Sequence, residues 1–187
     1  MHKLIVTAHP SSQGFTHEIA RTLESLSLAK WDTVEILDLY TTELHQDFLR
    51  FEDIRAYRDA TKNDTTTLAL QAQIKKADEI VLIFPTWWGD MPAIMKNWMD
   101  SNFMAGFAFE YIDGKSVGLL KWKTARIITT SGAPSFFYKI LLHVQMLWNM
   151  NRIGYCGIEQ KSFTVFGEMD SKKTDRTRYL EKVKTLV

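Results

Sequence analysis

The sequence predicts an α/β protein with a doubly wound, five-stranded parallel sheet and helices on both faces of that sheet. Two observations lead to this prediction. Short runs rich in β-branched residues alternate with longer amphipathic segments, which is the pattern of β-α-β units. The chain has 187 residues and shows neither an internal repeat nor a linker-like stretch, so we expect a single domain over residues 1–187.

Five runs of apolar and β-branched residues are the expected strands, at 3–8, 33–39, 79–85, 124–130 and 161–166. Amphipathic helices are expected at 15–28, 68–77, 92–103, 136–150 and 174–186. Pro92 suits the first position of its helix because its missing N–H costs nothing there. Residues 40–65 have no clear periodicity and look like an insertion with a short helix around 51–60. Residues 104–122 are expected to form a long loop.

The composition excludes several classes of protein. Apolar residues make up 45% of the chain and charged residues 24%, as in a globular protein, and no run is apolar enough for direct membrane insertion. Lysine and arginine number 23 against 22 acidic residues, a balance that argues against nucleic acid as a partner. The basic stretch at 172–178 is diluted by acidic residues and is expected to be a solvated helix face. Cys156 is the only cysteine, which excludes an internal disulfide and predicts a cytoplasmic location.

Ligands of a doubly wound sheet bind beyond the carboxyl ends of the strands, near the point where the strand order reverses. The segments most suited to bind a ligand are therefore 8–16, 84–92 and 129–138, which follow the first, third and fourth expected strands. All three combine glycine or proline with hydroxyl groups and aromatic rings. Aromatic rings in such loops either face a planar ligand or cap a core. We predict an organic ligand at this edge, and no metal.

The first of these segments joins a strand end to a helix N-terminus, where free N–H groups and the helix dipole favour an anion. Ser11, Ser12 and Thr16 add hydroxyl donors, and Gly14 allows a close approach, so the segment is interpreted as a phosphate cradle near His9. The alternative is an ordinary N-capped helix, because serine and threonine are common caps. Neither a G-x-G-x-x-G motif nor a Walker A lysine is present.

The second segment is a turn bracketed by Pro85 and Pro92, and it carries Trp87, Trp88 and Gly89. A rigid turn that exposes two indoles and main-chain amides suits an aromatic heterocycle. The alternative is that both tryptophans pack the following helix onto the sheet.

In the third segment, Thr130, Ser131 and Gly132 again allow the backbone to approach a ligand. Tyr138 and His143 follow on the next expected helix and could donate protons, since histidine is the side chain that titrates nearest neutrality. The alternative is that Tyr138 caps the core and His143 faces water.

Together these residues resemble the NAD(P)H:quinone oxidoreductase (DT-diaphorase) family, which includes short bacterial members and the ancillary flavoproteins of potassium-efflux systems. The resemblance covers nearly the whole chain, and its most specific part is the stretch FPTWWGDMPAIMKNWMD, followed by ITTSGAP. It implies a flavodoxin-like fold, tightly bound FMN or FAD, and a homodimer with both active sites at the interface. It also implies that NAD(P)H reduces the flavin, which then reduces a quinone or a similar small aromatic acceptor.

The resemblance assigns flavin contacts by position, and Ser11 joins them from the chemistry of its loop. The residues concerned are His9, Ser11, Phe15, Thr16, Gln71, Pro85, Thr86, Trp87, Trp88, Gly89, Thr130, Ser131 and Gly132. The amides of Ser131 and Gly132 are expected to reach the carbonyl edge of the flavin ring. Phe109 and Tyr111 match residues that close the active site of the partner subunit.

Several positions depart from the family pattern. Thr16, Ser131 and Gly89 stand where the family has an asparagine, a glycine and an aromatic residue. The family's catalytic tyrosine falls on Phe137, one place before Tyr138, whereas its histidine matches His143. Tyr138 and His143 are therefore the candidate catalytic residues.

Some alternatives stay open. A flavodoxin-type electron carrier would have the same fold, although such carriers are usually strongly acidic and this chain has a net charge of +1. A regulatory flavin module of a potassium-efflux type transporter would share the same motifs. The absence of the C-terminal extension of longer family members favours FMN over FAD, and the choice between NADH and NADPH is open.

Overall fold

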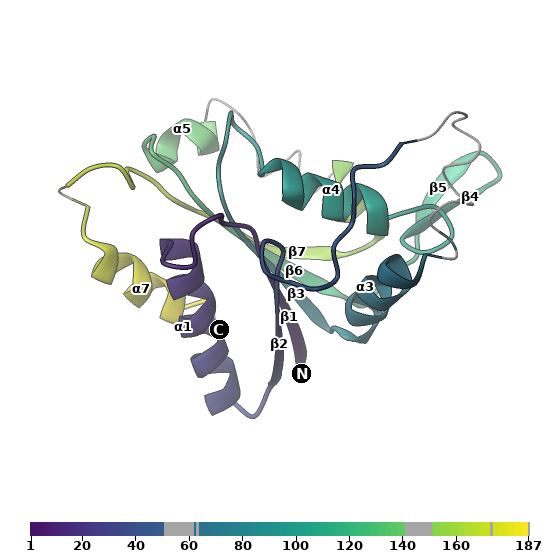
Figure 1. Cartoon of the computed structure of the whole chain (residues 1–187), viewed down its shortest axis with the longest axis horizontal. Helices are drawn as coiled ribbons and strands as arrows, with labels where there is room; N and C mark the ends of the chain where they lie inside the picture. The colour runs from purple at the N-terminus through teal and green to yellow at the C-terminus, as the bar shows by residue number, and fades with distance from the viewer. Residues whose placement is uncertain (51–61, 63, 141–150, 173, 187) are drawn as a thin grey trace.

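The computed structural model describes residues 1–50, 62, 64–140, 151–172 and 174–186 (Figure 1). In chain order its elements are β1 (His2–Thr7), α1 (Phe15–Ala29), β2 (Thr33–Asp38), α3 (Thr65–Lys76), β3 (Glu79–Pro85), α4 (Ala93–Asn102), β4 (Phe109–Ile112), β5 (Lys115–Gly118), β6 (Thr124–Thr130), α5 (Ser135–Ile140), the 3₁₀ helix η2 (Gly154–Cys156), β7 (Glu159–Phe166) and α7 (Arg176–Lys184). Five strands form one parallel sheet in the order β2-β1-β3-β6-β7. The predicted doubly wound sheet is confirmed.

The strands are nearly continuous apolar runs because both faces of the sheet are covered. All seven residues of β3 are buried. Side chains alternate between two clusters, as the two-residue period of a strand requires. In β1, for example, Leu4 and Val6 belong to one cluster and Ile5 to the other.

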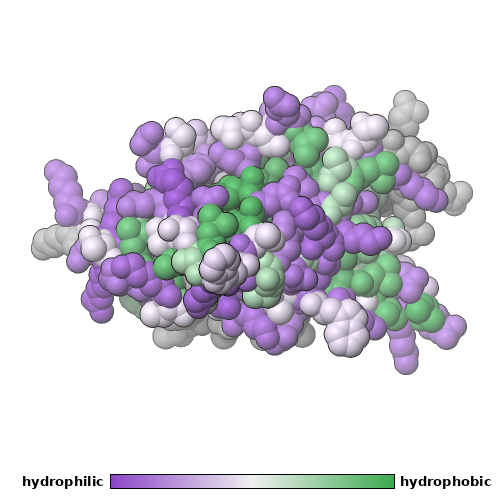
Figure 2. Space-filling view, turned by 90° about the horizontal axis from the view of Figure 1, so that it is seen from below, coloured by the Kyte–Doolittle hydropathy of each residue, from purple (hydrophilic) through white to green (hydrophobic). Residues whose placement is uncertain are grey.

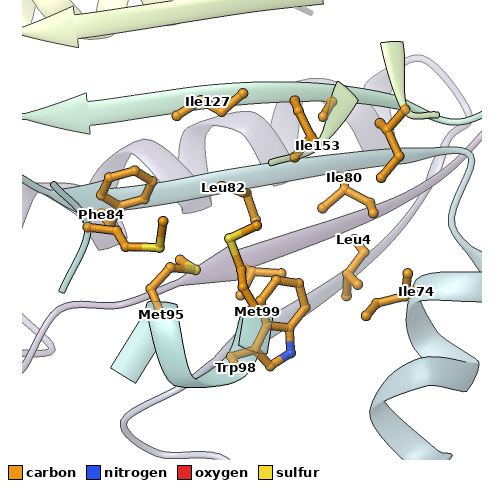
Figure 3. Packing of buried hydrophobic residues seen from close by; sticks show 14 of the residues in the cluster. Leu4, Ile74, Ile80, Leu82, Phe84, Met95, Trp98, Met99, Ile127 and Ile153 are labelled. Carbon is orange, nitrogen blue, oxygen red and sulfur yellow. The ribbon is translucent and has the colours of Figure 1, made fainter. Parts of the chain in front are cut away.

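Helices on both faces complete the layers. α1 and α7 cover one face, where Ile19, Leu23 and Val183 pack against the strands, while α3 and α4 cover the other (Figure 1). On that second face, side chains of α4, among them Met95 and Trp98, point toward the strands (Figure 3). These helices fix the positions of the loops that precede them.

Residues 104–122 do not form the long loop that was expected. They contain an antiparallel hairpin, β4–β5, whose register runs from Phe109 opposite Gly118 to Ile112 opposite Lys115. Its turn residues, Asp113 and Gly114, both have left-handed φ angles, of 51° and 75°. Asp-Gly between strand-like residues is a strong hairpin signal, because this turn needs a positive φ at both central positions.

The other expected helices differ from the observed ones at their ends or extend beyond the described residues. Pro92 is the N-cap of α4 and not its first helical residue. The expected helix at 51–60 lies outside the described residues. The helix expected at 136–150 begins as α5 at Ser135, and residues 141–150 lie outside the described part.

The amino end of the sheet is occupied by ion pairs. Lys3 lies 3.0 Å from Asp32 and 3.6 Å from Glu79, and Glu79 also pairs with Arg126 at 2.7 Å. Seen from below, the side of Figure 1 on which the N-terminus lies, the surface is mostly hydrophilic with smaller hydrophobic patches (Figure 2). Within the described part of the chain, no helix has the length and hydropathy that a membrane crossing would need. The ligand loops lie at the opposite, carboxyl end of the strands.

Candidate functional site

A cavity of about 400 Å³ lies at the carboxyl edge of the sheet. The connections that follow four strands contribute to its wall, and all three segments singled out in the sequence are among them. The lining residues are His9, Gln13, Gly14, Phe15 and Thr16 after β1, Pro85, Thr86 and Trp87 at the end of β3, Thr130, Ser131 and Gly132 at the end of β6, and Met169, Asp170 and Arg176 after β7. The volume lies in the usual range for a small-molecule site.

The loop after β1 presents a helix N-terminus that no side chain caps. Gly14 is the N-cap of α1 and offers no side-chain acceptor, while Ser11 and Ser12 lie exposed before it. The alternative of an ordinary serine or threonine cap is therefore wrong for this loop. The Thr16 hydroxyl is buried and has no hydrogen-bond partner among the described residues. An orphan hydroxyl on the cavity wall, at a helix N-terminus without a side-chain cap, is a donor that suits a phosphate.

Gly14 is needed for close packing against His9. A Cβ atom at position 14 would lie only 2.5 Å from Nδ1 of the His9 ring. That nitrogen also lies 3.0 Å from both the backbone nitrogen and the backbone oxygen of Ser11. The δ nitrogen thus tethers the imidazole in either protonation state at the cavity wall.

The second loop folds into a tight turn. The backbone amide of Trp87 donates to the carbonyl of Asp90 at 2.8 Å, and the Asp90 amide donates back to Trp87 at 3.0 Å. The two central residues, Trp88 and Gly89, have left-handed φ angles of 52° and 81°. A large side chain rarely adopts such a φ, and outliers of this kind concentrate at functional sites.

The exposure of the two tryptophans excludes the alternative that both pack the next helix onto the sheet. The Trp88 side chain is fully exposed and that of Trp87 is 43% exposed. Trp88 and Gly89 do not line the cavity themselves, but they lie in the same turn as Trp87, which does.

The third loop corrects one expectation. The Ser131 amide donates to the Phe166 carbonyl at 2.9 Å, and the Ser131 carbonyl accepts from the Met169 amide at 2.9 Å. The Ser131 amide is therefore already used and does not donate to a ligand. Gly132 supplies the remaining amide of this turn. A Cβ atom at position 132 would meet the carboxylate of Asp170, whose exposed side chain would have to move aside.

Tyr138 lies buried behind this turn. Its hydroxyl accepts a hydrogen bond from Oγ of Ser131 at 2.9 Å, and Ser131 Oγ in turn accepts from the Ala133 amide at 3.0 Å. Tyr138 does not line the cavity, so its connection to the site runs through Ser131. His143 lies outside the described residues.

Gln71 lies apart from the cavity. It belongs to α3, and its side-chain nitrogen donates to the Asn102 carbonyl at 3.1 Å. The contact that the resemblance assigns between Gln71 and flavin stays a prediction.

Phe109 and Tyr111 belong to an aromatic cluster that also contains Tyr155. The ring of Phe109 lies 4.9 Å from that of Tyr155 and 5.8 Å from that of Tyr111, and the Tyr155 hydroxyl donates to the Tyr111 hydroxyl at 3.2 Å. Tyr111 is 59% exposed. Phe109 and Tyr155 border a second cavity of about 300 Å³. Sequence reasoning missed Tyr155 because only the tertiary packing brings it to the hairpin.

Arg176 is a second residue that the sequence did not reveal. The basic stretch around it was expected to be a solvated helix face, yet Arg176 lines the cavity and its guanidinium lies 5.6 Å from the centre of the Phe15 ring. Met169 and Asp170 join it from the same connection. One signal was available: this segment follows the fifth strand, whose carboxyl end lies at the same edge as the other loops.

Comparisons with known proteins identify the family to which the chain belongs. A protein of Haemophilus influenzae described as an uncharacterized NAD(P)H oxidoreductase is 32% identical over 181 residues, which cover 90% of this chain and 85% of that protein. An FMN-dependent NADH:quinone oxidoreductase of Metamycoplasma arthritidis is 29% identical over 154 residues, covering 80% and 76%. The crystal structure of Smu.1420 from Streptococcus mutans superposes with a TM-score of 0.84 at 29% identity, covering 100% of this chain and 98% of that one. A sequence profile for the flavodoxin-like fold matches residues 1–187, so the chain belongs to the Flavodoxin_2 family.

Proposed function

We propose that the protein is an FMN-dependent NAD(P)H:quinone oxidoreductase. The observation that carries this proposal is the cavity of about 400 Å³ at the carboxyl edge of the sheet, which joins an uncapped helix N-terminus to an exposed tryptophan turn. The first feature suits a phosphate and the second a planar ring, and FMN contains both. The names of the Haemophilus and Metamycoplasma relatives support the same activity.

The residues of the cavity divide into two groups. Around the loop after β1, Thr16, His9 and Arg176 would hold the phosphate, since they offer a buried hydroxyl, a tethered imidazole and a guanidinium. At the other end of the cavity, Trp87 and Gly132 would hold the ring. When bound, flavin accepts a hydride from NAD(P)H and passes the reducing equivalents to a quinone.

The protein's own contribution to this chemistry is orientation and charge stabilisation. The Gly132 amide is a fixed donor, and fixed donors stabilise negative charge that develops on a reduced ring without reorganising. Behind it, Ser131 Oγ holds its proton in the hydrogen bond to Tyr138. This buried pair supports the Gly132 turn.

The working unit is proposed to be a homodimer in which the aromatic cluster of Phe109, Tyr111 and Tyr155 walls the active site of the partner subunit. The support is the exposure of Tyr111, because aromatic residues are enriched at interface cores and contiguous exposed aromatic surface usually marks an interface. Phe109→Ala should leave the flavin content unchanged and raise the acceptor KM. Mixing this variant with a subunit that cannot bind flavin should show a defect that acts in trans, whereas a fully active monomer would refute the dimer.

The buried, single Cys156 supports the further proposal of a cytoplasmic location, which cell fractionation would test.

The test of the activity is anaerobic stopped-flow reduction of the FMN-loaded protein, followed by mixing with menadione. The proposal expects NADH or NADPH to bleach the flavin absorbance within the turnover time, and menadione to restore it. A flavin that neither nucleotide reduces would contradict the proposed enzyme while leaving flavin binding intact. That outcome would move the protein toward the electron-carrier or regulatory class.

A further inference from the structure

The tryptophan turn, Trp87–Asp90, is held in an unfavourable shape. Its two central residues have left-handed backbones, and only Gly89 adopts that conformation freely. Trp88 is fully exposed, so its own side-chain packing cannot hold the turn in place. The two backbone hydrogen bonds between Trp87 and Asp90 close the turn, and the neighbouring Thr86 amide, which donates to the Thr130 carbonyl at 2.7 Å, anchors its start. A further contact would anchor its other end, at Asp90.

Asp90 makes this contact with both of its carboxylate oxygens. Oδ1 accepts from the Met91 amide at 2.7 Å, at the start of the connection to α4. Oδ2 accepts from Nη2 of Arg152 at 2.5 Å. A carboxylate whose two oxygens are both engaged is fixed in orientation, and charge-assisted bonds of this kind are stronger than those between neutral groups.

Arg152 comes from a distant part of the chain, 62 positions after Asp90. Its side chain is 21% exposed, and it lines the second cavity together with Phe109 and Tyr155. The Arg152 guanidinium thus connects two places: the Trp87–Asp90 turn beside the cavity of about 400 Å³, and the wall of the cavity of about 300 Å³ that Phe109 and Tyr155 form. A surface ion pair without such a connection would contribute little.

We propose that Arg152 is a positioning residue: through Asp90 it holds the Trp87–Asp90 turn in its left-handed shape, and the turn in that shape orients the flavin ring. The role in orienting the flavin ring rests on the proposed function, whereas the role in holding the turn does not. The shape of the turn can be measured in the protein without flavin. Losing Arg152 should loosen the turn first, and should weaken and reorient the bound ring as a consequence.

The experiment compares Arg152→Ala with a matched control, Lys161→Ala, which removes the exposed pair of Lys161 and Glu159 at 2.8 Å near the amino end of β7. Hydrogen exchange of the Trp87 and Asp90 amides is measured in the flavin-free protein. FMN affinity and the visible circular dichroism of bound FMN are measured in the loaded protein. We expect exchange at both amides to accelerate, and FMN binding to weaken, each on the order of tenfold in Arg152→Ala and not in Lys161→Ala.

Two conservative variants sharpen the result. Arg152→Lys keeps the charge without the planar guanidinium and should restore part of the affinity. Asp90→Asn keeps an oxygen for the Met91 amide but loses the charge, so it should behave like Arg152→Ala.

Unchanged exchange in Arg152→Ala would overturn the proposal. Faster exchange with unchanged FMN affinity and dichroism would overturn the role in orienting the ring. If the wild-type protein binds no FMN, the proposed function and the ring-orienting role both fail, and the exchange data alone decide whether Arg152 holds the turn.

Discussion

Replacing Gly14 with alanine should weaken flavin binding while leaving the fold intact. The backbone at Gly14 has φ −64° and ψ 147°, an extended conformation that alanine adopts without strain. A substitution of this kind stabilises a protein by about 0.4–1 kcal/mol, because alanine has fewer unfolded conformations than glycine. The new methyl group, however, would lie 2.5 Å from the His9 ring. This ring is a half-buried side chain at a cavity wall, so it can rotate away with the loss of its contact with Ser11.

The effect on binding follows from the loss of His9. A hydrogen bond from the imidazole to a charged phosphate is worth about 1.5–3 kcal/mol. Its loss corresponds to a dissociation constant for FMN that is roughly ten to a hundred times larger. The unfolding free energy of the flavin-free protein should change by less than about 1 kcal/mol, because the two effects of the methyl group on stability oppose each other.

Fluorescence titration with FMN and chemical denaturation of the flavin-free protein measure the two quantities. The control is the double variant His9→Ala with Gly14→Ala. If Gly14→Ala acts by displacing His9, it should have no further effect once the ring is gone, so the two changes should be strongly non-additive. Additive losses in affinity would refute this reasoning and place the contribution of Gly14 in the loop backbone instead.

Two further substitutions and one measurement on the wild-type thiol test other parts of the molecule. Trp87→Ala should weaken FMN binding by about 1–3 kcal/mol, the scale of a lost stacking ring, because Trp87 lines the cavity; unchanged affinity would remove Trp87 from the site. Tyr138→Phe should cost about 1 kcal/mol of unfolding free energy through the lost bond to Ser131. Stopped-flow flavin reduction at the wild-type rate in that variant would exclude a proton-donor role for Tyr138. Burial raises the pKa of the Cys156 thiol to about 12; because the folded state favours the neutral thiol, stability should fall as the pH rises above the ordinary thiol pKa of about 8.5, and native protein should resist alkylation at pH 8.5 where unfolded protein reacts. Rapid alkylation of the native protein would show that Cys156 is accessible.

The sheet could be predicted because its strands are buried on both faces and therefore read as apolar runs. The stretch Glu79–Pro85 shows this most clearly, since the expected and observed bounds agree. The alternation of strands and helices predicted a doubly wound parallel sheet, whereas the strand order β2-β1-β3-β6-β7 came only from the structure. The hairpin at Phe109–Gly118 was readable in principle from Asp113 and Gly114, but the segment was expected to be a loop.

The sequence predicted which loops form the site, but it did not predict the hydrogen bonds within and between them. Glycine, proline and tryptophan mark the three loops in the sequence. Whether the Ser131 amide is available depends on the Phe166 carbonyl, which only the pairing of β6 with β7 brings near it. Arg152 and Asp90 likewise meet only through the tertiary fold, since nothing near either residue in the sequence indicates the other.

The measurement that tests the central claim most directly is the absorbance spectrum of the purified protein, with mass spectrometry of any cofactor that heating releases. We predict a yellow protein with flavin absorbance bands and a released mass equal to that of FMN. Protein that was purified without flavin should take it up on titration with micromolar FMN, with a change in flavin fluorescence. A colourless protein that shows no fluorescence change with either FMN or FAD would contradict the account.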